Sequence, residues 1–198
     1  KEYRRQRQMC IRDSNYPVND GSMQVRLHIG PISGREAGLE KFSAGYLSNP
    51  MELFHASMIS VHTIGAYLWN SKSYDAWAAW EVALADLIPV ESDRAAMREF
   101  FRMTLGLSGS WAPAINSVIG ECATAWRAGR PQDAAKTARS AARKLDEQHA
   151  VIMAPEFCAP KLRSDCAPWL AKYAKGSGWL NALADALDSC TADSDRQL

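Results

Sequence analysis

Several features that mark common classes of protein are missing from this sequence of 198 residues. No apolar run approaches the roughly 20 residues that a membrane helix needs. Residues 1–7 are polar and basic, and no apolar core of a secretory signal follows them. We therefore expect no membrane span, and a protein that is cytoplasmic or has already lost a targeting segment. The net charge of +1 provides no overall attraction to nucleic acid or to a membrane surface.

Familiar catalytic motifs are also missing. The sequence contains no G-x-S-x-G elbow and neither of the common glycine-rich phosphate loops. Its 5 cysteines form no C-x-x-C pair. Cys158 and Cys166 each begin a Cys-Ala-Pro triplet and could form a disulfide in an oxidising compartment, although free thiols are expected without a secretory signal. These absences favour a protein without a catalytic centre, and we expect no resident cofactor.

The clearest positive feature is a helical hairpin between Trp111 and His149. Ser110 can cap its first helix, Gly129 can end that helix, and Pro131 can begin the second. One face of the second helix carries small and apolar residues at helical spacing: Ala134, Ala138, Ala141, Ala142 and Leu145. Alanine at such positions lets two helix backbones approach closely, so the segment predicts a tight pair of helices.

Similar patterns predict further helices on both sides of the hairpin. They fall at residues 36–47, 50–69, 74–87, 92–105, 169–174 and 179–187, whereas the alternation over Met23–Ile29 predicts one short strand. The predicted fold is all-α: a single domain of six to eight short helices with a short N-terminal extended arm or strand. We place the arm at 1–31, the domain at 32–190 and a flexible tail at 191–198. Residues 1–14 fit no element pattern and do not enter this prediction.

The segment 114–147 resembles the hairpin of a tetratricopeptide repeat. Gly129, Ala134 and Ala141 occupy places that match the turn glycine and the two packing alanines of that family. The resemblance covers about one repeat, and true arrays need three or more units. It implies a surface that binds peptides or partner proteins, while an ordinary alanine-rich hairpin explains the same residues.

Glu52 and His55 have a spacing that places a carboxylate and an imidazole on one helical face. His62 follows seven residues later, and Asp146-x-x-His149 supplies a second acid–histidine pair. Di-iron carboxylate bundles use Glu-x-x-His in this way. The pattern therefore makes Glu52, His55, His62 and His149 candidate ligands of a transition metal in a helical-bundle enzyme, although polar residues on an outer helix face look the same.

A basic stripe gives a third hypothesis, because it could follow a phosphate backbone or contact a partner. Its residues are Arg127, Arg130, Lys136, Arg139, Arg143 and Lys144. Residues 75–99 carry six acids and two bases, and residues 127–175 carry ten bases and five acids, so the two stretches have opposite net charges. With the 7 tryptophans, a residue type enriched at interfaces, this favours a non-enzymatic helical protein that binds a partner protein or assembles as a structural subunit. The alternatives are the metal-dependent enzyme and a nucleic-acid-binding subunit.

Overall fold

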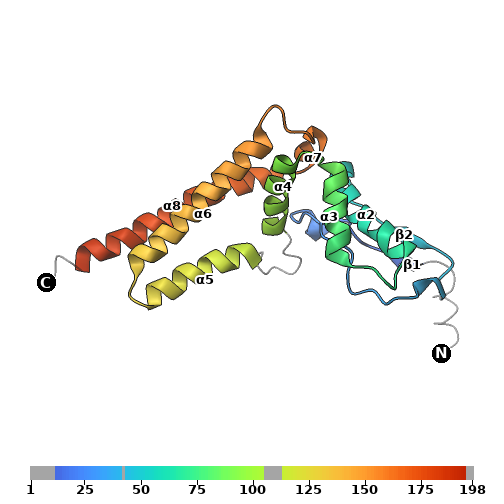
Figure 1. The fold of residues 1–198 in the computed structure, drawn as a ribbon, viewed down its shortest axis with the longest axis horizontal. Helices are drawn as coiled ribbons and strands as arrows, with labels where there is room; N and C mark the ends of the chain where they lie inside the picture. The colour runs from blue at the N-terminus through green and yellow to red at the C-terminus, as the bar shows by residue number, and fades with distance from the viewer. Residues whose placement is uncertain (1–11, 42, 105–112, 195–198) are drawn as a thin grey trace. The chain divides into compact units, whose positions relative to one another are not determined.

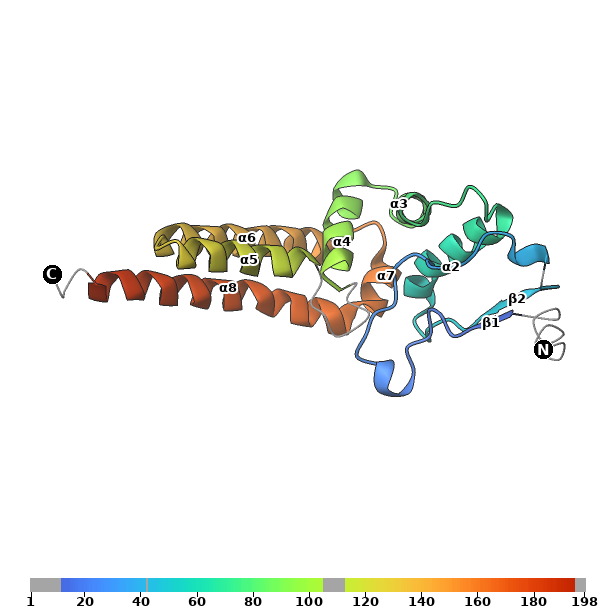
Figure 2. The same ribbon diagram turned by 90° about the horizontal axis from the view of Figure 1, so that it is seen from below.

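The structure is a computed structural model that describes residues 12–41, 43–104 and 113–194, and its elements are shown in Figures 1 and 2. In chain order they are β1 (Arg12–Ser14), η1 (Gly21–Met23), η2 (Leu39–Lys41), β2 (Tyr46–Ser48), α2 (Phe54–Trp69), α3 (Ala76–Leu87), α4 (Glu91–Thr104), α5 (Pro113–Arg127), α6 (Pro131–Met153), α7 (Pro160–Asp165) and α8 (Ala167–Ser194). The all-α class with a short extended N-terminal part is confirmed. No helix in these ranges is long and apolar enough to cross a membrane.

The chain divides into two compact units. Unit 1 contains residues 1–94 and 158–166, and unit 2 contains residues 95–157 and 167–198. The short segment 158–166, which includes α7, therefore belongs with the N-terminal half although it comes late in the chain. The domain limits expected at 31/32 and 190/191 stay a prediction.

Unit 1 combines a small parallel sheet with α2, α3, the short α7 and much irregular backbone. β1 and β2 pair in parallel, with Arg12 opposite Tyr46. The strand expected at Met23–Ile29 is not formed, since that stretch begins in η1 and continues as loop. Leu27 and Ile29 are nevertheless buried, at 2% and 0% exposed, whereas Val25 is 67% exposed. The alternating pattern therefore indicated burial only in the second half of the stretch, and without strand pairing.

The helix expected at 36–47 is also replaced, by η2 and β2. Gly38 has a φ of +89°, which lies outside the right-handed helical region. Its backbone N–H donates to Ser71 Oγ at 2.9 Å instead of to a helical carbonyl. The backbone at Gly38 therefore interrupts the helical path that the side-chain pattern predicted.

The helices α2 and α3 form as the sequence predicted, within a few residues. α3 begins at an Asp75 cap, whose carboxylate accepts the backbone N–H of Ala78 at 2.8 Å. α2 and α3 pack on each other, and Trp80 on α3 is completely buried. These helices form the scaffold on which the irregular part of unit 1 rests.

Unit 2 contains the predicted hairpin, formed by α5 and α6. Gly129 adopts a φ of +69° at the turn, and the N–H of Arg130 donates to the carbonyl oxygen of Ala125 at 2.9 Å. α6 packs against both α5 and α8 (Figure 1). The buried cluster that joins the three helices consists of Cys122, Ala125, Ala134, Ala135, Ala138, Ala184 and Leu187.

The two short helices expected near the C-terminus are one continuous helix, α8. Gly176 and Gly178 lie between the two predicted segments. At Gly176, an added Cβ would lie 3.2 Å from Leu145 Cδ1 on α6. This glycine therefore permits a close helix approach within an unbroken helix. The proline-rich connection before α8 contains α7, and Cys158 and Cys166 beside it are free thiols.

Candidate functional site

The carboxyl ends of β1 and β2 lie side by side and place two asparagines at one edge of the sheet. Ser14 and Ser48 are paired at the last position of the strands. Asn15 and Asn49 follow directly, and the N–H of Asn49 donates to the carbonyl oxygen of Ser14 at 3.0 Å. Both asparagines are exposed. Parallel sheets bind ligands at this edge, so Asn15 and Asn49 define a candidate site, which we call the carboxyl edge.

The segment 15–20 that leaves β1 also carries a carboxylate. Ser48 Oγ donates to the carbonyl oxygen of Tyr16 at 2.7 Å, which ties the start of this segment to the end of β2. Asp20, at its other end, is exposed and makes no side-chain capping hydrogen bond to η1. Its carboxylate can therefore accept hydrogen bonds from a ligand.

Buried side chains from α2 and α3 hold the irregular backbone that follows this segment. Unpaired backbone groups are costly to bury, so a loop with buried backbone needs such partners. Trp80 Nε1 donates to the carbonyl oxygen of Ile29 (2.7 Å), and the N–H of Ile32 donates to Thr63 Oγ1 (3.0 Å). The single O–H of Ser60 lies within hydrogen-bond distance of two carbonyl oxygens, those of His28 (2.9 Å) and Gly30 (3.0 Å), and is shared between them. The loop is thereby fixed although it has no regular structure.

Two tyrosine hydroxyls extend this set of hydrogen bonds. Tyr16 donates to the carbonyl oxygen of Gly30 at 2.6 Å, and Tyr74 donates to that of Ile32 at 2.8 Å. Burial raises the pKa of Tyr16 to about 12 and also raises the pKa of Tyr74. Both phenols therefore stay protonated at neutral pH and remain donors.

The amino end of α2, just after Asn49, is capped from a distant part of the chain. Asp165 Oδ2 accepts the N–H of His55 at 2.7 Å and that of Ala56 at 3.1 Å. Leu53, at the N-cap position itself, makes no side-chain capping bond. A carboxylate at a helix N-terminus satisfies free N–H groups and complements the helix dipole. The segment 158–166 thus stabilises the helix that begins beside the carboxyl edge.

A cavity of about 240 Å³ lies at the other end of β2. It is lined by Leu39, Glu40, Ser43, Ala44, Gly45, Tyr46, Tyr67, Leu68 and Ser71. Tyr46 begins β2 and Asn49 follows its end. The cavity is therefore distinct from the carboxyl edge.

The four predicted metal ligands form no cluster in the part of the chain that the structure describes. Glu52 is exposed before α2, and His55 lies 3.6 Å from Asp165 through Nδ1. His62 Nε2 pairs with Asp86 of α3 at 3.0 Å, while His149 is on α6 of unit 2. Within the described ranges, no group of three or more His, Cys, Asp or Glu side chains is gathered as a metal site requires.

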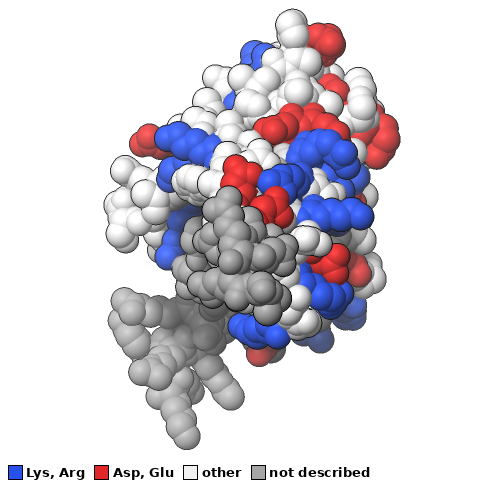
Figure 3. All heavy atoms as spheres, turned by 90° about the vertical axis from the view of Figure 1, so that its left-hand side faces the viewer, with Lys and Arg blue, Asp and Glu red and all other residues white. Residues whose placement is uncertain are grey.

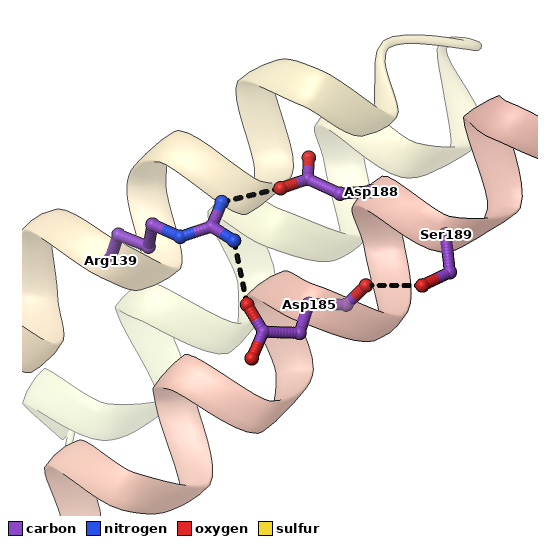
Figure 4. Close-up of polar contacts among 4 residues, drawn as sticks. All are labelled: Arg139, Asp185, Asp188 and Ser189. Carbon is purple, nitrogen blue, oxygen red and sulfur yellow. Dashed lines mark hydrogen bonds and ion pairs between the residues drawn. The ribbon is translucent and has the colours of Figure 1, made fainter.

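The basic stripe of α5 and α6 is partly neutralised by acids. Arg130 pairs with Asp133 at 3.0 Å and Arg143 with Glu147 at 3.7 Å. Arg139 bridges from α6 to Asp185 and Asp188 of α8, at 2.7 and 2.6 Å (Figure 4). Arg127, Lys136 and Lys144 are exposed. Figure 3 shows Lys and Arg interspersed with Asp and Glu on this end of unit 2, so the stripe is not a continuous positive surface.

Sequence reasoning missed Asn15, Asp20 and Asn49. Residues 1–14 fit no element pattern, so the sequence does not indicate β1, and Asn15 falls within the predicted N-terminal arm. Ser48 or Asn49 can instead be the cap of a helix that begins at Pro50. An available signal was the polar residue directly after each of two short extended stretches, 12–14 and 46–48, because parallel strands present such residues at a common edge.

Comparison with known proteins identifies relatives of this chain. Residues 2–102 match the family model described as beta-N-acetylglucosaminidase. A solved structure of a mutant O-GlcNAc hydrolase from Thermobaculum terrenum is 25% identical, with a TM-score of 0.76 over 88% of this chain and 37% of that one. The fold of CpGH84B is also similar, at 23% identity and a TM-score of 0.63, over 93% of this chain and 32% of that one. The chain thus spans about a third of the length of each.

These matches correct two predictions. The resemblance of 114–147 to a tetratricopeptide repeat is wrong as a family assignment, since the matched family extends over residues 2–102 and the hairpin is one part of a larger helical fold. The prediction of a non-enzymatic binding protein or structural subunit is also wrong, as are its metal-enzyme and nucleic-acid alternatives, because the relatives are sugar hydrolases by description. Compact sequence motifs do not indicate this site, because the candidate site combines residues from separate strand ends.

Proposed function

This chain belongs to the beta-N-acetylglucosaminidase family, and from that premise we propose that it forms part of an enzyme that hydrolyses glycosides of N-acetylglucosamine. The carboxyl edge contacts the sugar. One observation carries the proposal: Asn15 and Asn49 follow adjacent parallel strands and are both exposed. Ligands of parallel sheets bind at that position.

The chemistry of the carboxyl edge suits this ligand. An asparagine amide can donate through its nitrogen and accept through its oxygen, which matches the hydroxyl and acetamido groups of the sugar. The carboxylate of Asp20 accepts hydrogen bonds from hydroxyls. Few and well-placed polar groups of this kind orient a small ligand.

The sheet itself supports an enzyme with more strands than β1 and β2. Parallel sheets are normally covered on both faces and contain several strands, and a two-stranded sheet is marginal in water. Since this chain spans about a third of the length of these relatives, we propose that strands in the rest of the enzyme complete it. Glycoside hydrolysis generally uses a pair of carboxyl groups at the scissile bond, and these strands would bring such a pair to the carboxyl edge.

The test is sugar binding by the purified chain and its variants, and hydrolysis by the longer enzyme of which we propose that this chain is a part. Binding of N-acetylglucosamine is measured by saturation-transfer NMR, and hydrolysis is measured with 4-nitrophenyl N-acetyl-β-D-glucosaminide. Asn15→Ala and Asn49→Ala should each weaken binding about tenfold, the effect of one lost hydrogen bond in a polar site.

Asn70→Ala is the matched control, because Asn70 is an exposed asparagine at the opposite end of α2. It should bind the sugar as the unchanged chain does. If the purified chain does not bind N-acetylglucosamine and the longer enzyme does not hydrolyse the nitrophenyl glycoside, or if all three variants behave alike, the proposed function is wrong.

A further inference from the structure

A buried histidine, His28, makes direct contacts with the segment 15–20. Only 6% of its surface is exposed. Its Nδ1 lies 2.8 Å from the carbonyl oxygen of Val18. A carbonyl oxygen only accepts, so Nδ1 carries the hydrogen and donates it. Val18 precedes Asp20 by two residues, and this bond therefore fixes the backbone close to that carboxylate.

The same ring also contacts the other end of the segment. The rings of His28 and Tyr16 are stacked, with centroids 6.1 Å apart and planes inclined by 17°. Tyr16 directly follows Asn15. One side chain thus touches residue 16 through its face and residue 18 through its edge, between the two candidate sugar-binding positions.

The backbone of His28 is itself fixed to the scaffold of unit 1. Its carbonyl oxygen accepts a hydrogen bond from Ser60 Oγ of α2 at 2.9 Å. The next residue, Ile29, accepts the indole N–H of Trp80 from α3. A continuous series of hydrogen bonds therefore runs from the helices through His28 to Val18.

The second ring nitrogen, Nε2, makes the buried histidine destabilising for the fold. With the hydrogen on Nδ1, Nε2 is an acceptor, and among the described residues no group donates to it. A buried acceptor without a partner is destabilising. A phenylalanine would stack on Tyr16 without this cost but could not donate to Val18. The Nδ1 hydrogen bond is the property that only the polar ring supplies.

We propose that His28 is a positioning residue, which holds the segment 15–20 in the conformation that presents Asn15 and Asp20 to the sugar. The proposal rests on the proposed function of the carboxyl edge and assigns the control of its shape to one buried ring. His28 does not itself touch the sugar.

Three substitutions at His28 separate its hydrogen bond from its bulk. In His28→Asn the side-chain nitrogen can occupy the place of Nδ1 and donate to Val18. In His28→Gln the side-chain nitrogen reaches the place of Nε2 instead, and His28→Phe keeps only a ring. We would measure amide hydrogen exchange at Tyr16, Val18 and Asp20 in this chain, together with KM and kcat for the nitrophenyl glycoside in the longer enzyme that carries the same substitution.

His28→Gln and His28→Phe should exchange these amides about tenfold faster and raise KM about tenfold, as expected for the loss of one buried hydrogen bond. kcat should change less. His28→Asn should restore exchange and KM to within about threefold of the unchanged chain. Exchange in α2 serves as the control for an intact fold.

Three results would overturn the proposal: unchanged exchange in His28→Phe, no rescue by His28→Asn, or faster exchange with an unchanged KM. Failure of the proposed function is recognised separately, because the unchanged chain would then show no binding and the longer enzyme no hydrolysis. In that case the exchange at residues 16–20 alone decides whether His28 holds the segment.

Discussion

The two compact units are stabilised in different ways. In unit 1, side chains of α2 and α3 donate to, or accept from, the backbone of a long irregular segment, as Trp80 does at Ile29. In unit 2, regular helices satisfy their own backbone, and small residues such as Ala138 and Gly176 let them approach closely. One unit depends on particular hydrogen bonds between residues far apart in sequence, and the other depends on the size of side chains.

This difference relates to function. A candidate site at the ends of strands needs loops of defined but irregular shape, and such loops need partners for their backbone groups. Unit 1 provides those partners from buried polar side chains, including Ser60 and Thr63, both 0% exposed. Substitutions that remove single polar or aromatic groups should therefore affect unit 1 most, and substitutions that change volume should affect unit 2 most.

The largest effect should come from Trp80→Ala in unit 1. The side chain is fully buried, and its removal leaves a cavity and an unpaired carbonyl at Ile29. We expect the free energy of unfolding to fall by about 3–5 kcal/mol, measured by urea denaturation. Trp77→Ala is the control on the same helix: Trp77 is 55% exposed, so its loss should cost about 1 kcal/mol. Equal losses of unfolding free energy in the two variants would contradict the structural role of the buried Trp80.

The helices of both units were predictable, and the reason is local. The limits of α2, α3, α4 and α6 follow from the spacing of apolar residues, from caps such as Asp75 and from Pro131 at a helix start. The predictions of a strand at 23–29 and of a helix at 36–47 failed because the backbone conformation there depends on distant partners. Ser71 receives the N–H of Gly38 from 33 residues away, and no local pattern contains that information.

The next largest decrease in the free energy of unfolding should come from a change of side-chain volume in unit 2. Ala138 is 0% exposed on the face of α6 that meets α5 and α8. Ala138→Leu should overfill this interface and lower the free energy of unfolding by about 1–3 kcal/mol. Ala150→Leu, at an exposed position of the same helix, should have almost no effect, because both residues favour helices. If the two variants have equal stability, the alanine interface is loosely packed and the contrast between the units is lost.

The long-range cap of α2 should have a smaller effect. Asp165→Ala removes the acceptor for the N–H groups of His55 and Ala56 and should cost about 1 kcal/mol. Asp165→Asn keeps an acceptor oxygen and should cost less. Asp133→Ala removes an exposed carboxylate at the start of α6 and should cost about 0.5 kcal/mol or less. Thermal unfolding of the three variants ranks them, and equal losses for Asp165→Ala and Asp133→Ala would contradict the capping role.

The candidate site was less predictable than the helices. Asn15, Asp20 and Asn49 are ordinary polar residues in sequence, and only the parallel pairing of β1 with β2 brings the two asparagines to one edge. That pairing joins stretches more than 30 residues apart and only three residues long. Short strands carry little periodic signal, so the sequence could not show that they were partners.

His28 should make the stability of unit 1 depend on pH. Burial lowers the pKa of His28 below its ordinary value of 6.5, and the nearby charge of Arg26 lowers it further, although the bond to Val18 acts in the opposite direction. As the pH falls below about 6.5, the unfolded chain binds a proton before the folded one does. The free energy of unfolding should therefore decrease on acidification, down to the lowered pKa. Urea titrations from pH 8 to 5 should show a weaker decrease in His28→Asn, and parallel curves would contradict burial as the cause.

The smallest effect should come from Arg139→Ala, although Arg139 makes the most conspicuous contacts of unit 2. It joins α6 to both Asp185 and Asp188 of α8 (Figure 4), yet all three side chains are 43% exposed or more. Water and salt screen exposed charges, and holding three flexible side chains costs entropy. At 150 mM salt the unfolding midpoint should therefore shift little, and the shift should grow only as salt is removed. A large shift that salt does not reduce would mean that unit 2, like unit 1, depends on particular polar contacts, and the contrast between size and hydrogen bonding would no longer hold.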